Sequence, residues 1–218
     1  YNMDDLQQHI HKLREDFSKG ALSEDEAEKD PALQFKIWMQ QAVESHVPEV
    51  QAMNLATVSA DGKPSSRIVY LREFGDHSYC FYTNYQSKKA RELEQQPFAA
   101  LTFFWPQLER QIRIEGTVEK ADAKQSDAYF NLRPFESKVG AWASNQSGKL
   151  LSRRELENRV ETLKLQFDPA NIQRPNFWGG LVLKANYYEF WQGRKSRLHD
   201  RLAYSLTNSA WTISRLAP

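Results

Sequence analysis

Three ionisable side chains near the carboxyl end of the chain have the type and spacing of a ligand site. Residues 187–192 have the two-residue period of a strand, and a polar stretch follows them. Arg197, His199 and Arg201 then recur at every second position, so an extended chain would place them on one side. Two guanidinium groups that flank an imidazole repel one another unless an anion lies between them. The spacing predicts an anionic ligand here, whereas the preceding basic residues fit a surface loop as well.

A second set of cations lies earlier in the chain. Arg67 shares its predicted strand face with apolar residues, which argues against a solvated edge position. Ser87 is a good helix N-cap, but Lys88 and Lys89 follow it at the helix end that carries partial positive charge. A bound phosphate would make that arrangement favourable, so phosphate binding is one hypothesis and a solvated helix end the other. Arg72 ends its strand, where a surface role and a functional role fit equally well.

A third group combines hydroxyls with a guanidinium. Tyr129, Arg133 and Ser137 recur at intervals of four, and Pro134 is expected to break the helix just after Arg133. The group suits a second phosphate, and an ordinary helix corner explains it nearly as well. Further side chains that could hydrogen-bond a heterocycle are Gln111, Gln146 and Ser147. Together the three groups predict one or two phosphorylated ligands, at least one of them with an aromatic ring.

Several other chemistries find no motif in the chain. There is no phosphate-binding P-loop, no G-x-G-x-x-G, no C-x-x-C and no G-x-S-x-G, and the five histidines lack metal-ligand spacing. A formal charge of +1 argues against nucleic acid or anionic lipid as a bulk electrostatic partner. No apolar run approaches the ~20 residues of a membrane span. The single cysteine, Cys80, is expected to be a small buried residue in a reducing compartment, which favours a cytoplasmic location.

The elements that must position these groups are mainly strands. The expected strands are residues 53–58, 65–72, 78–83, 99–105, 110–120, 181–185, 187–192, 202–206 and 211–215. The expected helices are residues 4–17, 31–46, 90–95, 122–132, 137–143 and one that starts after Ser152 and has an apolar stripe of Leu156, Val160, Leu163 and Phe167. The second of these helices should bury Leu33, Ile37, Trp38 and Ala42.

The order of the elements predicts one domain over residues 1–218. Residues 52–120 have the pattern of an antiparallel meander interrupted by one short helix, with a hairpin turn at Asp61-Gly62. The acidic loop of residues 23–30 is expected to be mobile, so residues 1–30 would form an arm or lid. Mainly antiparallel strands of this length would close best as a barrel with helices over its ends. A Rossmann fold is excluded because strands and helices do not alternate.

Six short motifs, taken together, resemble one known family. They are the E-F-W-Q at residues 189–192 with R-L-H-D-R at 197–201, R-I-V-Y-L at 67–71, F-Y-T-N at 81–84, Q-S at 146–147, F-W-G-G at 177–180 and R-L-A-P at 215–218. In order and spacing this set is similar to the pyridoxine 5′-phosphate oxidases. The resemblance covers nearly the entire chain, from about Arg14 onward.

The resemblance implies a fold, a cofactor and a reaction. The family's fold is an FMN-binding split β-barrel, and its homodimer binds an FMN at each of two sites between the subunits. It implies pyridoxal 5′-phosphate synthase activity, in which pyridoxine 5′-phosphate and pyridoxamine 5′-phosphate are oxidised to pyridoxal 5′-phosphate. Dioxygen would be the acceptor and hydrogen peroxide the second product. The alternatives are another split-barrel flavoprotein oxidoreductase and a non-catalytic flavin-binding protein.

The resemblance also assigns residues to roles. The implied FMN contacts are Arg67, Ile68, Val69, Tyr70, Leu71, Arg72, Tyr82, Thr83, Lys88, Lys89, Gln111, Gln146, Ser147, Trp191 and Arg201. The implied substrate contacts are Arg14, Phe17, Arg72, Tyr129, Arg133, Ser137, Arg197 and His199, of which Arg197 and His199 would lie beside the reacting carbon. Three positions depart from the family pattern: Arg72 replaces a lysine, Phe17 a tyrosine and Lys88 an arginine. None of the three removes a positive charge, so we expect a change in substrate affinity rather than in the reaction.

Overall fold

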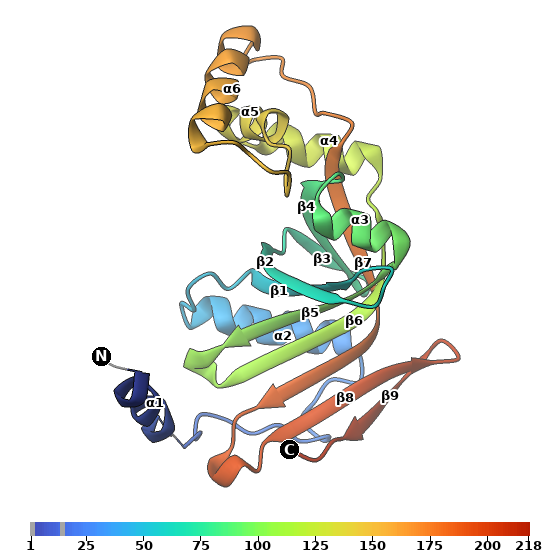
Figure 1. Cartoon of the computed structure of the whole chain (residues 1–218). Helices are drawn as coiled ribbons and strands as arrows, with labels where there is room; N and C mark the ends of the chain where they lie inside the picture. Colours follow the sequence, from blue (N-terminus) through green and yellow to red (C-terminus); the bar gives the residue numbers. More distant parts are fainter. Residues whose placement is uncertain (1–2, 14–15) are drawn as a thin grey trace. The chain divides into compact units, whose positions relative to one another are not determined.

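The computed structural model describes residues 3–13 and 16–218, and the chain divides into two compact units. Unit 1 comprises residues 1–50, 104–112 and 189–218. Unit 2 comprises residues 51–103 and 113–188. Three long strands run through both, so each unit is built from segments that lie far apart in the sequence (Figure 1).

Most of the sheet lies in unit 2. Its strands are β1 (Ala52–Val58), β2 (Pro64–Tyr70), β3 (Glu73–Gly75), β4 (Ser78–Asn84), β5 (Phe98–Trp105), β6 (Arg110–Lys120) and β7 (Trp178–Gln192). Their order is β2-β1-β5-β6-β7-β4-β3. The pairs β1/β2, β1/β5, β3/β4 and β4/β7 are antiparallel. The prediction of a mainly antiparallel fold is therefore confirmed.

The predicted meander over residues 52–120 is wrong where it continues from its first hairpin: β2 lies at one end of the strand order, β4 near the other, and β5 pairs with β1. β4 does not lie beside β5. Instead β4 pairs with β7, where Tyr82 lies opposite Gly180, because α3 (Lys88–Gln95) carries the chain away from β4 before β5 begins. The β1/β2 hairpin is confirmed, and Gly62 in its turn has a φ of 80°, a conformation that favours glycine.

Helices cover parts of unit 2 and are capped as their sequences indicate. Asp122 caps α4 (Ala123–Leu132), and Ser152 caps α6 (Arg153–Gln166). α5 (Phe135–Ala143) packs with α6 in a cluster built on Phe130 and Trp178, as the neighbouring helices in Figure 1 show. This cluster fixes the direction from which α4 and α5 present side chains to the neighbouring cavity.

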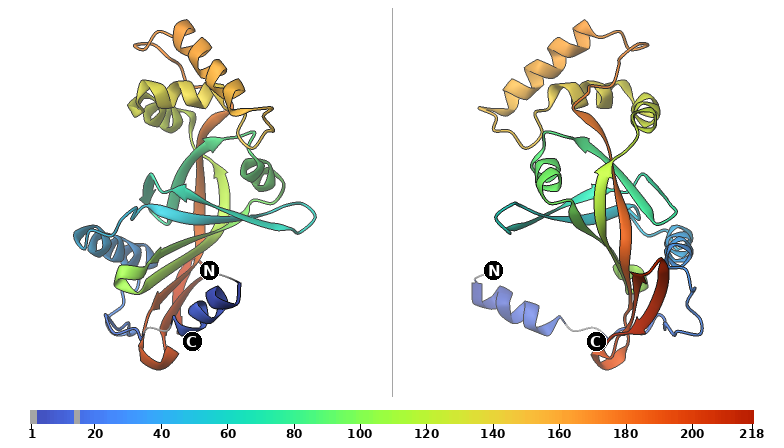
Figure 2. Two further views of the ribbon diagram at one scale, coloured as in Figure 1. Left: turned by 60° about the vertical axis from the view of Figure 1, so that its left-hand side comes forward. Right: turned by 90° about the vertical axis from the view of Figure 1, so that its right-hand side faces the viewer.

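Unit 1 contains α1 (Met3–Lys12), α2 (Pro31–Glu44), the short turns η1 (Pro106–Leu108) and η2 (Lys195–Arg197), and the strands β8 (Asp200–Thr207) and β9 (Ala210–Arg215). β8 pairs with β7 and with β9, as the two-stranded ribbon in Figure 2 shows. Asp30 caps α2, whose Trp38 ring packs edge-on against Phe190 of β7 at 5.3 Å. The predicted carboxy-terminal hairpin is confirmed, with Leu202 opposite Arg215.

Four other predictions about elements need correction. The first helix ends at Lys12 rather than at residue 17, and the apolar residues of its predicted stripe, Leu6 and Ile10, are exposed. The strands predicted at 181–185 and 187–192 are one strand, β7, because the residues between them stay extended. β3 was not predicted. In α2, Leu33 is exposed and Phe35 is buried in its place.

Two findings concern the chain's environment. Cys80 is buried as predicted, and burial raises the pKa of its thiol to about 12. Over residues 3–13 and 16–218, no helix combines the length and the apolar character needed to cross a membrane.

Candidate functional site

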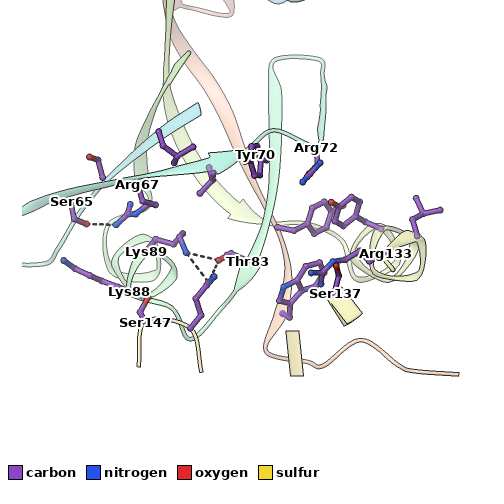
Figure 3. A pocket seen from close by; sticks show the side chains of 18 of the residues that line it. Ser65, Arg67, Tyr70, Arg72, Thr83, Lys88, Lys89, Arg133, Ser137 and Ser147 are labelled. Atoms are coloured by element: carbon purple, nitrogen blue, oxygen red, sulfur yellow. Dashed lines mark hydrogen bonds between the residues drawn. The ribbon is translucent and has the colours of Figure 1, made fainter. Parts of the chain in front are cut away.

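A cavity of about 910 Å³ in unit 2 collects many of the residues singled out from the sequence (Figure 3). It is lined by Ser65, Ser66, Arg67, Ile68, Val69, Tyr70, Arg72, Tyr82, Thr83, Lys88, Lys89, Tyr129, Leu132, Arg133, Pro134, Ser137, Gln146, Ser147 and Trp178. Leu71 is not in this lining: its side chain is buried and its N–H donates to the carbonyl of Gln51. Figure 3 shows two groups of cations, with Arg67, Lys88 and Lys89 in one and Arg72 and Arg133 in the other.

Arg67 is held in place by the sheet and by α3. Its guanidinium donates to the Leu55 carbonyl at 3.1 Å, to Thr57 Oγ1 at 2.6 Å and to Ser65 Oγ at 2.7 Å. It also lies 3.3 Å from a carboxylate oxygen of Glu92, which is buried. Arg67 is therefore half-buried, pre-positioned and only partly neutralised at the cavity wall.

Burial and hydrogen bonds act in opposite directions on Glu92. Burial alone would raise the pKa of its carboxyl group. Hydrogen bonds from Thr57 and Ser65, with the charges of Lys88 and Arg67, outweigh burial and lower the pKa. Glu92 is thus an anion that organises the cation group. The sequence contained one signal for it, the i, i+4 spacing from Lys88, which we did not use.

Lys89 is the most informative cation of the first group. Its ammonium donates to Thr83 Oγ1 at 3.1 Å, Gln146 Oε1 at 3.2 Å and Ser87 Oγ at 3.4 Å, all neutral oxygens. Burial, helped by the charge of Arg67, lowers the pKa of Lys89 to about 8. Among the residues that the structure describes, Lys89 has no carboxylate partner within 4.0 Å. A buried ammonium in this state suits an anionic ligand.

The N-terminus of α3 lies beside a loop that completes this group. Ser147 Oγ accepts the Lys88 backbone N–H at 3.1 Å, and Ser147 has a positive φ of 68°. Gln146 Oε1 accepts from Thr83 Oγ1 at 2.7 Å. The first group therefore brings together a helix N-terminus, two lysines and Arg67, which is the donor set that a phosphate requires.

Aromatic rings form another part of the cavity wall. Tyr82 stacks on Tyr129 with 3.8 Å between ring centroids and on Trp178 with 5.4 Å. Burial, followed by the hydrogen bond that its hydroxyl donates to Glu73, raises the pKa of Tyr82. Tyr82, Tyr129 and Trp178 together offer flat apolar surface between polar groups.

The second group of cations has an unsatisfied donor. The Arg133 guanidinium lies over the Trp178 ring, 4.6 Å from its centroid, and its Nη1 is buried without a hydrogen-bond partner in the described structure. Burial lowers the pKa of Arg133; Tyr129 opposes this shift, and the positive charge of Arg72 adds to it. Ser137 also lines the cavity here. This part of the cavity therefore has two guanidinium groups and a hydroxyl, and the Arg133 guanidinium has a donor without a partner in the described structure. Such a set suits a second anion.

Unit 1 contains a different kind of group. Phe17 packs edge-on against Trp191 at 5.7 Å and against His199 at 5.5 Å, and Trp191 lies 4.6 Å from His199. Gly193 permits this contact, since a Cβ there would lie 2.7 Å from the Phe17 ring. Arg14 lies outside the described residues.

The predicted extended run from residue 197 to residue 201 is wrong. Residues 195–197 form the η2 turn, in which Ser196 and Arg197 have positive φ values, and β8 begins only at Asp200. The three side chains therefore do not alternate along one strand. Instead His199 Nδ1 accepts the Arg194 backbone N–H at 3.2 Å, and burial, followed by the charge of Arg197, lowers the pKa of the imidazole. A neutral His199 with Nδ1 as acceptor carries its proton on Nε2.

Arg201 has an internal partner. Its guanidinium donates to both carboxylate oxygens of the buried Glu189, at 2.9 and 3.1 Å, and to the Ala217 carbonyl at 2.6 Å. The charge of Arg201 is thus balanced within unit 1. Gln111 is half-buried on β6 of the same unit. The flavin contacts assigned to Arg201, Gln111 and Trp191 stay predictions.

The segment before α2 is tied to unit 1. Glu109 accepts the backbone N–H groups of Ser18 and Lys19 at 2.8 and 2.9 Å, and Arg194 donates to the Gly20 carbonyl. Arg215 forms a two-pronged ion pair with Glu24 at 2.8 and 2.6 Å. The mobility predicted for residues 1–30 stays a prediction, but residues 18–24 have specific partners in this conformation.

Comparison with known proteins identifies the family. A sequence model described as pyridoxamine 5′-phosphate oxidase matches residues 39–167, more than half of the chain. A second, described as the pyridoxine 5′-phosphate oxidase C-terminal dimerisation region, matches residues 178–218. The chain belongs to the pyridoxine/pyridoxamine 5′-phosphate oxidase family. The resemblance seen in the sequence motifs is confirmed.

Curated relatives in this family are similar over nearly the whole chain. Pyridoxine/pyridoxamine 5′-phosphate oxidase of Gloeothece citriformis (strain PCC 7424) is 48% identical over 98% of this chain and 100% of its own. The protein of the same name from Actinobacillus pleuropneumoniae serotype 5b (strain L20) is 49% identical over 96% of this chain and 99% of its own.

Solved structures show the same fold. PhzG from Burkholderia lata 383, in complex with tetrahydrophenazine-1-carboxylic acid, has a TM-score of 0.85 at 29% identity over 92% of this chain and 100% of its own. A pyridoxamine 5′-phosphate oxidase-related, FMN-binding protein from Nostoc punctiforme PCC 73102 has a TM-score of 0.68 at 19% identity, over 87% of this chain and 98% of its own. The fold is that of the FMN-binding split barrels, as the resemblance implied.

Proposed function

We propose that this chain oxidises pyridoxine 5′-phosphate and pyridoxamine 5′-phosphate to pyridoxal 5′-phosphate with FMN as its cofactor. FMN, when bound, would accept the hydride equivalent from the substrate and pass the electrons to dioxygen, which gives hydrogen peroxide; with the amine substrate, water would also be consumed and ammonia released. The protein's own residues would bind and orient the two ligands. The observation that carries the proposal is the unit 2 cavity, where two separate cation groups flank an aromatic wall.

The first group would hold the FMN phosphate. Lys89 has a buried ammonium bonded only to neutral oxygens, and a phosphate would supply the missing negative charge. Arg67 would add its guanidinium, and the partial positive charge at the N-terminus of α3 would favour the phosphate. Lys88 would contribute charge at longer range: its side chain is largely exposed, and its ammonium lies 3.6 Å from Glu92.

The second group would hold the substrate's phosphate. Arg133 has a buried donor with no partner in the described structure, and such a donor costs free energy unless a ligand satisfies it. Arg72 raises the local positive charge, and Ser137 adds a hydroxyl. A phosphate dianion can use several donors at once, which a single carboxylate does less well. This favours a phosphorylated substrate over a carboxylic acid such as the ligand in the PhzG structure.

The unit 1 group would act on the reacting end of the substrate. Neutral His199 has its proton on Nε2 and can donate a hydrogen bond there, while its Nδ1 is held by the Arg194 N–H. Arg197 would add a positive charge to clamp the substrate ring. Phe17 and Trp191 would exclude water from His199. None of these groups has to act as an obligatory base, because positioning supplies much of the rate.

We further propose that the working protein is a homodimer with the FMN sites at the interface between subunits. Residues 178–218 match a region described by its role in dimerisation in this family. The implied flavin contacts also fall in both units of one chain. Light scattering should give about twice the 25.4 kDa chain mass. A stable monomer that binds FMN and turns over would contradict this assembly.

One assay separates the proposal from its alternatives. The purified protein is loaded with FMN and incubated with pyridoxine 5′-phosphate or pyridoxamine 5′-phosphate, and pyridoxal 5′-phosphate and peroxide are both measured. Formation of the two products in equal amounts is expected. Flavin binding without turnover of either substrate would favour a non-catalytic flavin protein or a different oxidoreductase.

A further inference from the structure

A carboxylate outside the cavity lining contacts one of the rings in its wall. Glu73 is the first residue of β3, which pairs with β4 so that Glu73 lies opposite Cys80. From there its Oε1 accepts the Tyr82 hydroxyl proton at 2.5 Å. Its other carboxylate oxygen, Oε2, accepts from Gln125 Nε2 at 2.6 Å. One carboxylate therefore joins β4 to α4.

The two partners of Glu73 belong to the elements that form the aromatic wall. Tyr82 stacks almost parallel on Tyr129, with 12° between the ring planes. Gln125 and Tyr129 are four residues apart on α4, so they lie on one face of that helix. Glu73 thus fixes both sides of the Tyr82–Tyr129 stack, one through a hydroxyl and the other through the helix that bears Tyr129.

The wall continues from these rings to the second cation group. Tyr82 and Tyr129 both stack on Trp178, at 5.4 and 6.3 Å, and Arg133 lies over Trp178 at 4.6 Å. A shift of the stack would therefore move the surface on which the Arg133 guanidinium rests. Because Arg133 has a buried donor to offer, its placement decides how well the second anion is held.

We propose that Glu73 is a positioning residue for the substrate: its carboxylate locks the Tyr82–Tyr129 stack and thereby sets the substrate end of the cavity. The inference rests on the proposed function for the identity of the ligand, but its geometry does not depend on that identity. Glu73 touches neither ligand in this assignment. Its effect should appear in substrate binding and should pass mainly through the Tyr82 hydroxyl, with a smaller part through Gln125.

The test is a double-mutant cycle of Glu73→Ala and Tyr82→Phe in the FMN-loaded protein. Glu73→Ala should raise KM for pyridoxine 5′-phosphate about 3- to 10-fold and change kcat less than about twofold, the lower range expected for a charged hydrogen bond near solvent. In the Tyr82→Phe background only the bond from Gln125 remains to be lost, so Glu73→Ala should raise KM by clearly less than it does in the parent protein. Glu73→Gln, which keeps an acceptor for the hydroxyl, should restore most of the loss. A full effect of Glu73→Ala in the Tyr82→Phe background would overturn the proposal.

A matched control and a second measurement separate this proposal from the proposed function. Glu119 is another exposed carboxylate of unit 2, paired with Lys184 at 3.6 Å, so Glu119→Ala should leave KM unchanged. Near-ultraviolet circular dichroism of the FMN-free protein reports the stacked rings without any turnover. Glu73→Ala should change that spectrum and Glu119→Ala should not. An unchanged Glu73→Ala spectrum would refute the positioning role, whether or not the protein is active on the two substrates. A changed spectrum in a protein that turns over neither substrate would refute only the proposed function.

Discussion

The two units differ in how their cations are balanced. In unit 1, Arg201 and Arg215 each form a two-pronged ion pair with a carboxylate, Glu189 and Glu24 respectively. In unit 2, among the described residues, the Lys89 ammonium donates only to neutral oxygens and Arg133 has a buried donor without a partner. Unit 1 also has a half-buried cation with neutral partners, Arg110, but its guanidinium donates to Gln192 and Gln41, whereas Arg133 of unit 2 keeps a buried donor without a partner among the described residues.

The contrast shows that a cation's partner, rather than its charge, marks an anion site. Arg67 is intermediate between a balanced and an unbalanced cation. Glu92 lies 3.3 Å from its guanidinium, but the same carboxylate also accepts hydrogen bonds from Thr57 and Ser65. A buried charge without a partner is costly to fold, so its retention points to a ligand. Unit 1 instead offers a neutral imidazole among aromatic rings, which suits orientation of a reacting group more than capture of a phosphate.

The largest expected effect comes from removing the unsatisfied guanidinium. Arg133→Met should raise KM for pyridoxine 5′-phosphate about 10- to 150-fold, the range for one or two charge-assisted hydrogen bonds, while FMN affinity stays unchanged. The same substitution should leave the melting temperature equal or higher, because it removes a buried donor without a partner. Steady-state kinetics and a melting curve check both.

The matched control for that substitution is Arg174→Met. Arg174 is also in unit 2, but its guanidinium is satisfied by Asp127 and by the Trp178 carbonyl, both at 2.6 Å. This variant should lose stability and keep its KM. If Arg133→Met lost stability and kept its KM instead, the distinction between the two kinds of cation would be wrong.

A second prediction tests the role of unit 1. Arg197→Met should lower kcat/KM by at least about tenfold and leave FMN affinity and dimer mass nearly unchanged, because Arg197 is assigned to the substrate alone. His199→Asn should act mainly on kcat if its hydrogen bond tightens in the transition state. Flavin titration beside steady-state kinetics measures both parameters. If the Arg197→Met protein bound a full complement of flavin and kept its kcat/KM, the assignment of Arg197 to the substrate would be wrong.

A third prediction concerns pH and the first cation group. The pKa of Lys89 is about 8 in the ligand-free protein, and a bound phosphate would raise it, so the protonated form binds FMN more tightly. FMN affinity should therefore be constant below pH 8 and fall by up to about tenfold per pH unit above it. Folding shows the opposite sign: the unfolded chain, with an ordinary lysine pKa near 10.5, binds more protons between pH 8 and 10.5, so this group makes the free protein more stable as pH rises.

The dependence of FMN affinity on pH has its own control. Lys89→Met should weaken FMN binding at pH 7 and abolish the fall in affinity above pH 8, because no titrating ammonium remains at this position. Fluorescence titration of FMN against protein at pH 7, 8 and 9 supplies the data. An identical slope in Lys89→Met would mean that another group is responsible.

Local sequence rules predicted much of the fold because they act over short distances. The caps at Ser87 and Ser152, the turn at Gly62 and the alternation of β1 all depend on neighbouring residues. The path of β4 to β7 does not, because two antiparallel strands nearly a hundred residues apart leave no mark in the sequence between them. The true end of α1 was also missed, because its apolar stripe suggested a buried face that the structure does not show.

In the candidate site, too, some residues could be predicted from local patterns and others could not. Ser87, Lys88 and Lys89 were predictable because an N-cap followed by two lysines conflicts with the helix dipole unless an anion binds. Arg201 illustrates the limit, because no local pattern indicates that Glu189, twelve residues away, would neutralise it. The spacing rule used for residues 197–201 failed because positive φ at Ser196 and Arg197 turns the chain. Glu73 was missed because β3 has only three residues.

The smallest expected effect separates a hydroxyl from a backbone conformation. Ser147 accepts the Lys88 N–H and has a φ of 68°, a region that costs an ordinary residue roughly 1–2 kcal/mol relative to glycine. Ser147→Ala removes the hydroxyl and keeps the strain, whereas Ser147→Gly removes both. If the hydroxyl holds the flavin phosphate, both variants should weaken FMN binding about 2- to 5-fold by the same amount. If loop conformation matters instead, the two variants should differ in FMN affinity. Glycine adopts this φ without strain, and it also increases the number of conformations open to the ligand-free loop. Equal losses of FMN affinity in the two variants, with a higher melting temperature for Ser147→Gly, would show that the hydroxyl contacts the ligand. An unchanged FMN affinity in both variants would remove Ser147 from the first cation group.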